Sequence, residues 1–165
     1  MAHAASRKAR VWVLTVSDTR TEVDDESGRL CRTLAEGAGH EVVGYGILPD
    51  DPGAVRNRCR SLAESGDCDV ILVNGGTGIS PRDNTYEAVA ALLTKRLDGF
   101  GELFRMLSYA EVGSRALASR AVAGLADRTL LFAMPGSTKA VRLAMEKLIV
   151  PEIGHLAGEM RKGQS

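Results

Sequence analysis

Short apolar runs that alternate with segments of helical periodicity constrain the fold of this chain more than any other feature of its sequence. The runs "ARVWVLTVS" (9–17), "EVVGYGILP" (41–49) and "CDVILVNGG" (68–76) are rich in β-branched residues and predict buried strands. Residues 26–40 and 52–66 lie between them and carry apolar side chains at helical spacing. Alternating strands and helices form βαβ units, so we expect a largely parallel sheet with helices on both faces.

The second half of the chain predicts three more helices and a pair of strands. Helical spacing resumes from Thr85, again from near Gly99, and a last time over 141–148. Residues 120–137 contain two apolar runs joined by a short polar turn at residues 127–128. One strand of this pair must run antiparallel to the rest of the sheet, most simply at an edge.

The composition is that of one ordinary globular domain. No linker or shift in composition divides the 165 residues, and we expect a single domain over 1–165 with flexible tails at 1–8 and 160–165. Acidic and basic residues balance at 21 each, which argues against nucleic acid or a membrane surface as a partner. No run is long and apolar enough to span a bilayer or form a signal peptide, so we expect a cytoplasmic protein.

Polar and glycine-rich loops follow the predicted strands. They are "SDTRTEVDD" (17–25), "PDDPG" (49–53), "NGGTGISPRD" (74–83) and "PGSTK" (135–139). If the four preceding strands are parallel, all four loops meet at the carboxyl edge of the sheet, where open α/β sheets bind their ligands. The pattern therefore gathers Asp18, Asp50 and Asp83 with two glycine turns and several hydroxyl groups.

The loop "NGGTGISPRD" (74–83), which we call the glycine loop, allows two interpretations. Its glycines and a helix that begins near Asn84 are suited to bind a phosphate through backbone amides. Asn84 and Glu87 have the spacing of a capping box, in which the same residues only start a helix. A glycine cluster alone favours the second, purely structural interpretation.

The two aspartates nearest this loop also have structural alternatives. Asp83 occupies a position from which it can cap the next helix, and Asp50 can cap the helix that Pro52 opens. Two carboxylates at one phosphate-binding edge would repel each other unless a cation lay between them. Magnesium, which prefers one or two carboxylates together with substrate phosphates, suits such a site.

The remaining polar residues are explained by helix starts, and several common motifs are missing. Ser137 and Thr138 can cap the last helix or hold an anion, while residues 24–25 suit the start of the first helix. The chain has no G-x-G-x-x-G after its first strand and no lysine of a P-loop after the glycine loop. Its three histidines and three cysteines are too scattered to predict a zinc site or a disulfide framework.

Several linked motifs resemble those of the MoaB/MogA family of molybdenum cofactor biosynthesis. They are "GGTGISPRDNTYEA" (75–88), "GFGELFRMLSY" (99–109), "SRAVAG" (119–124) and "PGSTKA" (135–140), with "SDT" and "LPDD" after the first two strands. The similarity runs from about Val11 to His155. The residues of two motifs, "FGELFRMLSY" and "PGST", are more similar to the MoaB branch than to the MogA branch. The resemblance implies a three-layer α/β/α sandwich with a mostly parallel sheet and one antiparallel edge strand.

The resemblance also implies an activity. Family members bind molybdopterin, and some transfer the AMP moiety of ATP to its phosphate with Mg²⁺ and release pyrophosphate. They are usually trimers or hexamers, and other proteins of molybdenum cofactor biosynthesis are possible partners. We therefore expect a molybdopterin adenylyltransferase; the alternative is a carrier or oligomeric scaffold that binds the pterin without catalysis.

Family residues transfer to matching positions of this chain. Asp50 and Asp83 match the aspartates implicated in catalysis and magnesium binding. The expected substrate and phosphate contacts are Gly75, Gly76, Thr77, Gly78, Ser17, Asp18, Ser137 and Thr138. Arg82 and Lys139 are alternatives for a cation near the triphosphate. The chain departs from the family's usual "PRDVTPEA" at Asn84 and Tyr86, which replace an apolar residue and a proline, while Asp83 is kept.

Overall fold

The parallel strands form the centre of a six-stranded sheet. The computed structural model describes residues 8–162, and its strands are β1 (Arg10–Val16), β2 (Glu41–Leu48), β3 (Val70–Asn74), β4 (Lys95–Arg96), β5 (Val122–Ala126) and β6 (Thr129–Met134). Their order across the sheet is β2-β1-β3-β6-β5-β4. The pairs β1–β2, β1–β3 and β3–β6 are parallel, as the βαβ pattern predicts.

The antiparallel member of the sheet is β5. It pairs with β6 through a tight turn at Asp127, whose φ is 57°, and on its other side with the two-residue strand β4. β5 thus lies one position in from the edge. The sequence did not reveal β4, because two exposed residues carry no pattern, and the helix expected from Thr85 ends at Ala90 just before it.

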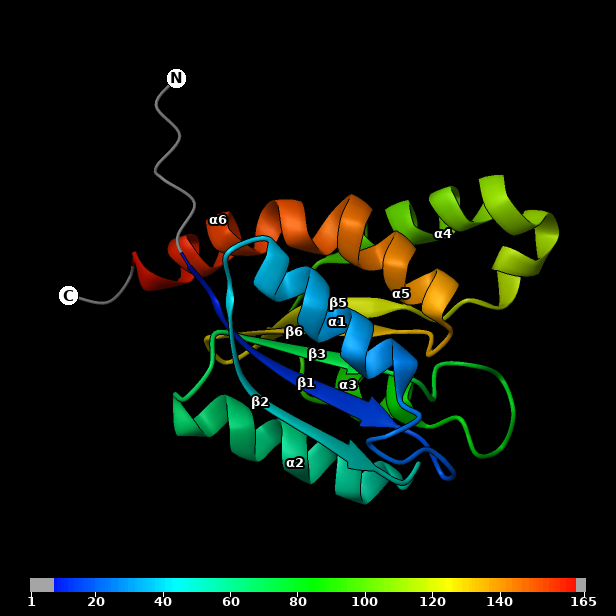
Figure 1. Cartoon of the computed structure of the whole chain (residues 1–165), viewed down its shortest axis with the longest axis horizontal. Helices are drawn as coiled ribbons and strands as arrows, with labels where there is room; N and C mark the ends of the chain where they lie inside the picture. The colour runs from blue at the N-terminus through cyan, green and yellow to red at the C-terminus, as the bar shows by residue number, and fades with distance from the viewer. Residues whose placement is uncertain (1–7, 163–165) are drawn as a thin grey trace.

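Helices cover both faces of the sheet (Figure 1). They are α1 (Glu26–Gly37), α2 (Pro52–Ser65), α3 (Thr85–Ala90), α4 (Asp98–Val112), the 3-10 helix η1 (Gly113–Ala118), α5 (Thr138–Ala144), the π-helical turn η2 (Met145–Ile149) and α6 (Val150–Arg161). One core cluster packs β1, β3 and β6 against α1, α4 and α5–α6, and a second packs the other face against α2 and α3. These layers confirm the three-layer sandwich.

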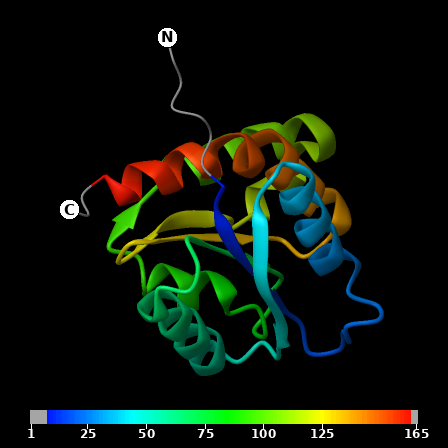
Figure 2. The same ribbon diagram turned by 60° about the vertical axis from the view of Figure 1, so that its left-hand side comes forward.

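Figure 2 brings β2 to the front at the edge of the sheet, beside β1. Alternation along the strands divides their side chains between the two faces: Val13 and Leu72 face the first cluster, and Leu14 and Ile71 the second. Every residue of β3 is buried, as expected for a central parallel strand covered on both sides.

The expected flexible tails are only partly within the described residues. Residues 1–7 and 163–165 lie outside them. Within the described residues, α6 continues to Arg161, so residues 160 and 161 of the expected tail are helical. An ion pair between Arg161 and Asp69, at the start of β3, holds this last turn, and a polar run of sequence gives no sign of such a distant contact.

Candidate active site

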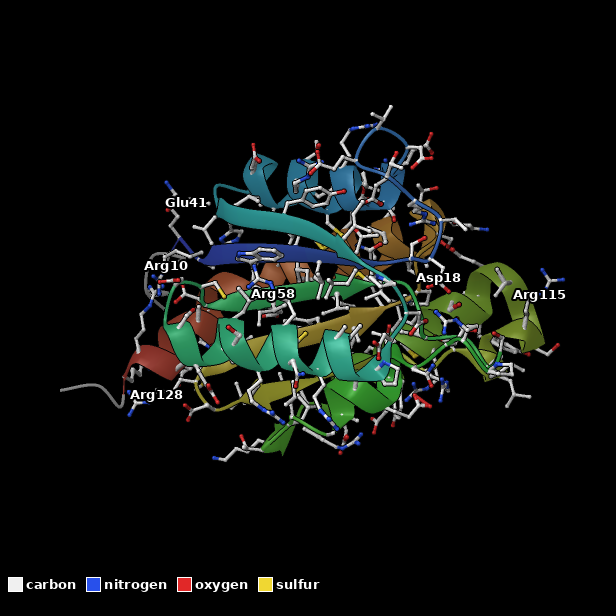
Figure 3. The ribbon with its side chains drawn as sticks, turned by 90° about the horizontal axis from the view of Figure 1, so that it is seen from below. Arg10, Asp18, Glu41, Arg58, Arg115 and Arg128 are labelled. Atoms are coloured by element: carbon white, nitrogen blue, oxygen red, sulfur yellow. The ribbon has the colours of Figure 1, made fainter. Side chains whose placement is uncertain are left out.

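The loops at the carboxyl edge of the sheet enclose a cavity of about 400 Å³. Figure 3 places Asp18 at this end of the molecule and Arg10 at the other. The cavity is lined by Val16, Ser17, Asp18, Thr19, Arg20, Asp50, Gly75, Gly76, Arg82, Asp83 and Gly136. Six of the ten residues expected from the sequence to form the site, namely Ser17, Asp18, Asp50, Gly75, Gly76 and Asp83, therefore line one cavity, which we call the acidic cavity.

Asp50 is the most buried carboxylate of the acidic cavity, with 5% of the residue exposed. Its Oδ1 accepts a hydrogen bond from the Asn84 backbone N–H at 3.1 Å, and its own N–H donates to Asp18 Oδ1 at 2.9 Å. Asp50 does not cap α2, because Asp51 does so by accepting from the Gly53 N–H. Burial raises the pKa of Asp50 and the neighbouring charges of Asp83 and Asp18 raise it further, although the Asn84 N–H opposes them.

Asp83 does not cap α3 either. Its Oδ2 accepts from the Ser80 N–H at 3.0 Å and so closes the turn that precedes the helix. The capping box expected between Asn84 and Glu87 is absent from the described residues, because the Asn84 side chain makes no cap and donates instead to the Pro81 carbonyl. In a capping box the Glu87 carboxylate would accept from the Asn84 N–H. Here the Asp50 carboxylate, which comes from another loop, accepts this hydrogen bond instead.

The glycines of the loop are required by close packing as well as by backbone angles. Gly75 and Gly76 have φ of 103° and 70°, which side chains rarely tolerate. A Cβ at Gly75 would collide with the Val16 carbonyl, and one at Gly76 with the Thr85 hydroxyl and the Asp50 carboxylate. The Gly75 N–H donates to the Met134 carbonyl at 3.0 Å, so this amide extends the sheet.

Arg82 lines the acidic cavity and pairs there with Asp18. Its Nε and Nη2 donate to the two carboxylate oxygens of Asp18 at 3.0 and 2.8 Å. This guanidinium holds the pKa of Asp18 below its usual range. Lys139, the other cation suggested by the sequence, does not line this cavity.

Arg20 is a cation of the acidic cavity that the sequence did not reveal. Its Nη2 donates to the Gly136 carbonyl at 3.0 Å, and its Nη1 lies 2.6 Å from Ser27 Oγ and 3.6 Å from Asp25 Oδ1. Asp25 is fully buried and accepts from the Tyr45 hydroxyl as well as capping α1. Only the position of Arg20, four residues after a strand, hinted at this role.

A second cavity of about 270 Å³ adjoins the same loop at its next two residues, Thr77 and Gly78. Most of its exposed lining is apolar, contributed by Phe104, Ala116 and Leu143, with Ser137 and Lys139 among its polar residues. We call it the apolar pocket. The Ser137 hydroxyl caps α5 by accepting from the Ala140 N–H at 3.1 Å. Thr138 lines neither cavity.

The donor set of the acidic cavity suits a magnesium ion held together with phosphates. Within residues 8–162, no three acidic, histidine or cysteine side chains gather closely enough to hold a metal ion alone. Asp50 and Asp83 offer two carboxylates, which is the number that Mg²⁺ uses when water and substrate phosphates supply the other ligands.

Among the described residues, 8–162, no helix is long and apolar enough to cross a membrane.

Known proteins share this fold and up to about half of the residues of this sequence. Residues 12–155 match the family described as "Probable molybdopterin binding domain". Molybdenum cofactor biosynthesis protein B of Bacillus cereus is 50% identical over 159 residues, which cover 96% of this chain and 94% of that protein. A crystal structure of a molybdenum cofactor biosynthesis protein B is 50% identical with a TM-score of 0.91, covering 96% of this chain and 99% of that one. A MogA structure is 28% identical with a TM-score of 0.81, covering 92% and 99%.

The fold and the matched residues define a molybdopterin-binding type of α/β domain. The chain belongs to the MoaB/MogA family of molybdenum cofactor biosynthesis proteins, and these identities place it nearer to MoaB than to MogA.

Proposed function

We propose that this protein is a molybdopterin adenylyltransferase that uses ATP and Mg²⁺. The observation that carries the proposal is the pair of cavities, one acidic and one largely apolar, that the glycine loop lines at successive residues. Two substrates of different character suit this arrangement, with the triphosphate in the acidic cavity and the pterin in the apolar pocket. The relatives' names support a substrate from molybdenum cofactor biosynthesis.

The reaction needs no general base. A phosphate oxygen of molybdopterin, already ionised, attacks the α-phosphorus of ATP. The new P–O bond forms as the bond to the bridging oxygen breaks, and pyrophosphate leaves with that electron pair. The barrier lies in bringing two anions together and in stabilising the leaving group, which are tasks for positioning and for fixed positive charge.

The residues of the acidic cavity match these tasks. Asp50 and Asp83 would hold magnesium, whose charge offsets that of the triphosphate when it is bound. We assign Arg20 to the departing pyrophosphate, because its guanidinium lines the cavity and its contacts with Gly136 and Ser27 fix its place. In the apolar pocket, Ser137 and Lys139 would contact the polar edge of the pterin or its phosphate.

We infer that the protein also self-associates. Four large apolar side chains of α4, namely Leu103, Met106, Tyr109 and Val112, are between 41% and 64% exposed. At this spacing each side chain lies next to the following one, so the four form a continuous apolar stripe that winds around the helix. Apolar patches on this scale commonly mark an interface between chains.

The adenylylation assay tests the proposed function. Purified protein incubated with molybdopterin and Mg-ATP should form AMP-linked pterin and release pyrophosphate. Asp83→Ala should abolish product, because it removes one of the two carboxylates proposed to hold magnesium. Arg142→Ala removes an exposed arginine paired with Glu146 on α5–η2 and should leave the rate unchanged.

A calorimetric titration separates the enzyme from a carrier. If folded wild-type protein binds molybdopterin but forms no adenylylated product, and if Mg-ATP does not change the affinity, the carrier or scaffold is the correct function. If Asp83→Ala turns over at the wild-type rate, the assignment of the aspartates is wrong.

A further inference from the structure

Arg120 contacts the glycine loop more extensively than any residue assigned above. It lies just before β5, and because β5 is antiparallel, its first residues lie at the carboxyl edge of the parallel strands. Its side chain is 28% exposed, and it lines neither the acidic cavity nor the apolar pocket. Arg120 therefore approaches the loop from outside the two cavities.

One guanidinium holds three carbonyl groups of the loop. Nε donates to the Thr77 and Gly78 carbonyl oxygens at 3.2 and 3.0 Å. Nη2 donates to the Gly78 and Asp83 carbonyls at 2.7 and 3.0 Å, and Nη1 pairs with the Glu87 carboxylate. The rigid fork of arginine suits such multiple contacts, and a lysine ammonium cannot make them all.

These contacts fix the direction of three backbone amides. In a planar trans peptide the N–H points opposite to the C=O, so the amides of Gly78, Ile79 and Asn84 point away from Arg120. The Asn84 N–H donates to Asp50 Oδ1 at 3.1 Å, in agreement with this geometry. Arg120 is thus connected, through a single peptide group, to a carboxylate of the acidic cavity.

Tyr86, one of the departures from the family pattern, also contacts Arg120. The Arg120 guanidinium lies 5.2 Å from the centre of its ring, within the range of a cation–π contact. The Tyr86 hydroxyl accepts from Arg96 at 3.4 Å. An aromatic ring at this position therefore packs against the guanidinium that holds the loop.

From these contacts we propose that Arg120 is a positioning residue, which holds the glycine loop in place and, through the Asn84 N–H, orients the Asp50 carboxylate toward the ligand of the acidic cavity. The inference rests on the proposed function for the identity of that ligand, a nucleoside triphosphate with its magnesium. Arg120 acts through the carbonyls and not through its charge on the ligand, since the Glu87 carboxylate already neutralises that charge.

Binding of Mg-ATP, followed by titration calorimetry, provides the first test. Arg120→Ala should weaken binding about tenfold, a loss typical of a few misplaced hydrogen bonds. Arg120→Lys should fall between Arg120→Ala and the wild type. Arg142→Ala serves as the matched control and should bind as the wild type does. Equal affinity of Arg120→Ala and the wild type would overturn the proposal.

Glu87→Gln distinguishes positioning from direct charge. If Arg120 acts through the carbonyls, this variant should change the affinity for Mg-ATP by less than about twofold, because the loop contacts persist. If Arg120 acts through its charge on the ligand, loss of the Glu87 carboxylate should strengthen binding several-fold, and the proposal is then wrong.

Chemical rescue separates positioning from a general loss of stability. Methylguanidinium at millimolar concentration should restore much of the Mg-ATP affinity of Arg120→Ala. Urea at the same concentration should not, because it is uncharged. If neither compound restores the Mg-ATP affinity of Arg120→Ala, and if the melting temperature of this variant falls in proportion to its affinity, the role of Arg120 is only structural.

Amide exchange keeps the test independent of the proposed function. If wild-type protein binds neither Mg-ATP nor inorganic pyrophosphate, the adenylyltransferase proposal fails, and the role of Arg120 is judged by hydrogen exchange at Asn84 and Thr85. Exchange there should be about tenfold faster in Arg120→Ala and unchanged in Arg142→Ala. Unchanged exchange in both would overturn the positioning role as well.

Discussion

Asp50 illustrates how the carboxyl edge of the sheet places a buried carboxylate among like charges. Only 5% of the residue is exposed, its neighbours include Asp18 and Asp83, and its strongest partner is a neutral amide. A carboxylate in such surroundings lowers the stability of the protein when no ligand is bound, because burial and repulsion both disfavour its ionised form. This cost is offset when a cation and a triphosphate occupy the cavity.

The first prediction follows from the raised pKa of Asp50. When a carboxyl has a higher pKa in the folded than in the unfolded protein, its ionised form destabilises the fold above that pKa, and the penalty disappears as the pH falls through it. Asp50→Asn should therefore raise the melting temperature at pH 8 by roughly 2–4 °C, the shift that about 1 kcal/mol produces in a domain of this size. Calorimetric melting should show the difference shrinking toward pH 4.

The control for this prediction is ligand binding. Asp50→Asn should lose affinity for Mg-ATP while it gains stability, since the amide cannot replace a carboxylate toward a cation. A variant that melts below the wild type at every pH would show that the Asn84 contact outweighs the burial of charge.

At the scale of single residues, the sequence predicted the location of the acidic residues better than their contacts. The sequence predicts Asp50 and Asp83 at one edge because each follows a parallel strand, and the carboxyl ends of parallel strands meet at one edge of the sheet. That Asp51 and not Asp50 caps α2, and that Asp83 closes a turn, depends on side-chain angles that the spacing leaves open. Arg120 was not predicted, because its role depends on the direction of β5.

At the scale of elements, α6 shows why the end of the chain could not be predicted from composition. Its last turn carries a polar sequence typical of a loose tail, yet Arg161 reaches Asp69 at the start of β3. Asp69 also accepts from the Arg10 backbone N–H at 2.8 Å and from the Arg10 side chain, so β1, β3 and α6 meet at one carboxylate. This cluster lies at the opposite edge of the sheet from the acidic cavity.

The second prediction concerns this cluster. Arg161→Ala should lower the free energy of unfolding by about 1 kcal/mol, because the pair is partly shielded from solvent but Asp69 keeps Arg10 as a partner. Urea unfolding measures the loss. Lys162→Ala, which breaks an exposed pair with Glu159 on the same helix, is the matched control and should cost almost nothing. Equal losses in the two variants would mean that Asp69 does not hold the helix.

At the scale of the whole molecule, the two faces of the sheet are covered by helices, but α4 keeps apolar side chains on its outer side. Phe100 and Phe104 of this helix pack into the core with Phe132, whereas Met106 and Tyr109 are 60% and 64% exposed. Helical spacing therefore produced two apolar sides on α4, and only one is used within the chain. The periodicity of the sequence indicated a helix here but did not separate its inner side from its outer side, since Leu103 shares the spacing of Phe100 and Phe104 and is 46% exposed.

The last prediction follows from that uncovered side. Met106→Glu with Tyr109→Glu should convert an oligomer into a monomer, because two charges placed in an apolar contact lose their hydration when it forms. Light scattering after size-exclusion chromatography reports the mass, and circular dichroism should show an unchanged fold. Val23→Glu is the control: Val23 is 85% exposed and apolar but belongs to the loop before α1 and not to α4, so the assembly should persist. A monomeric wild type, or an oligomer that survives both substitutions on α4, would show that this helix does not mediate association.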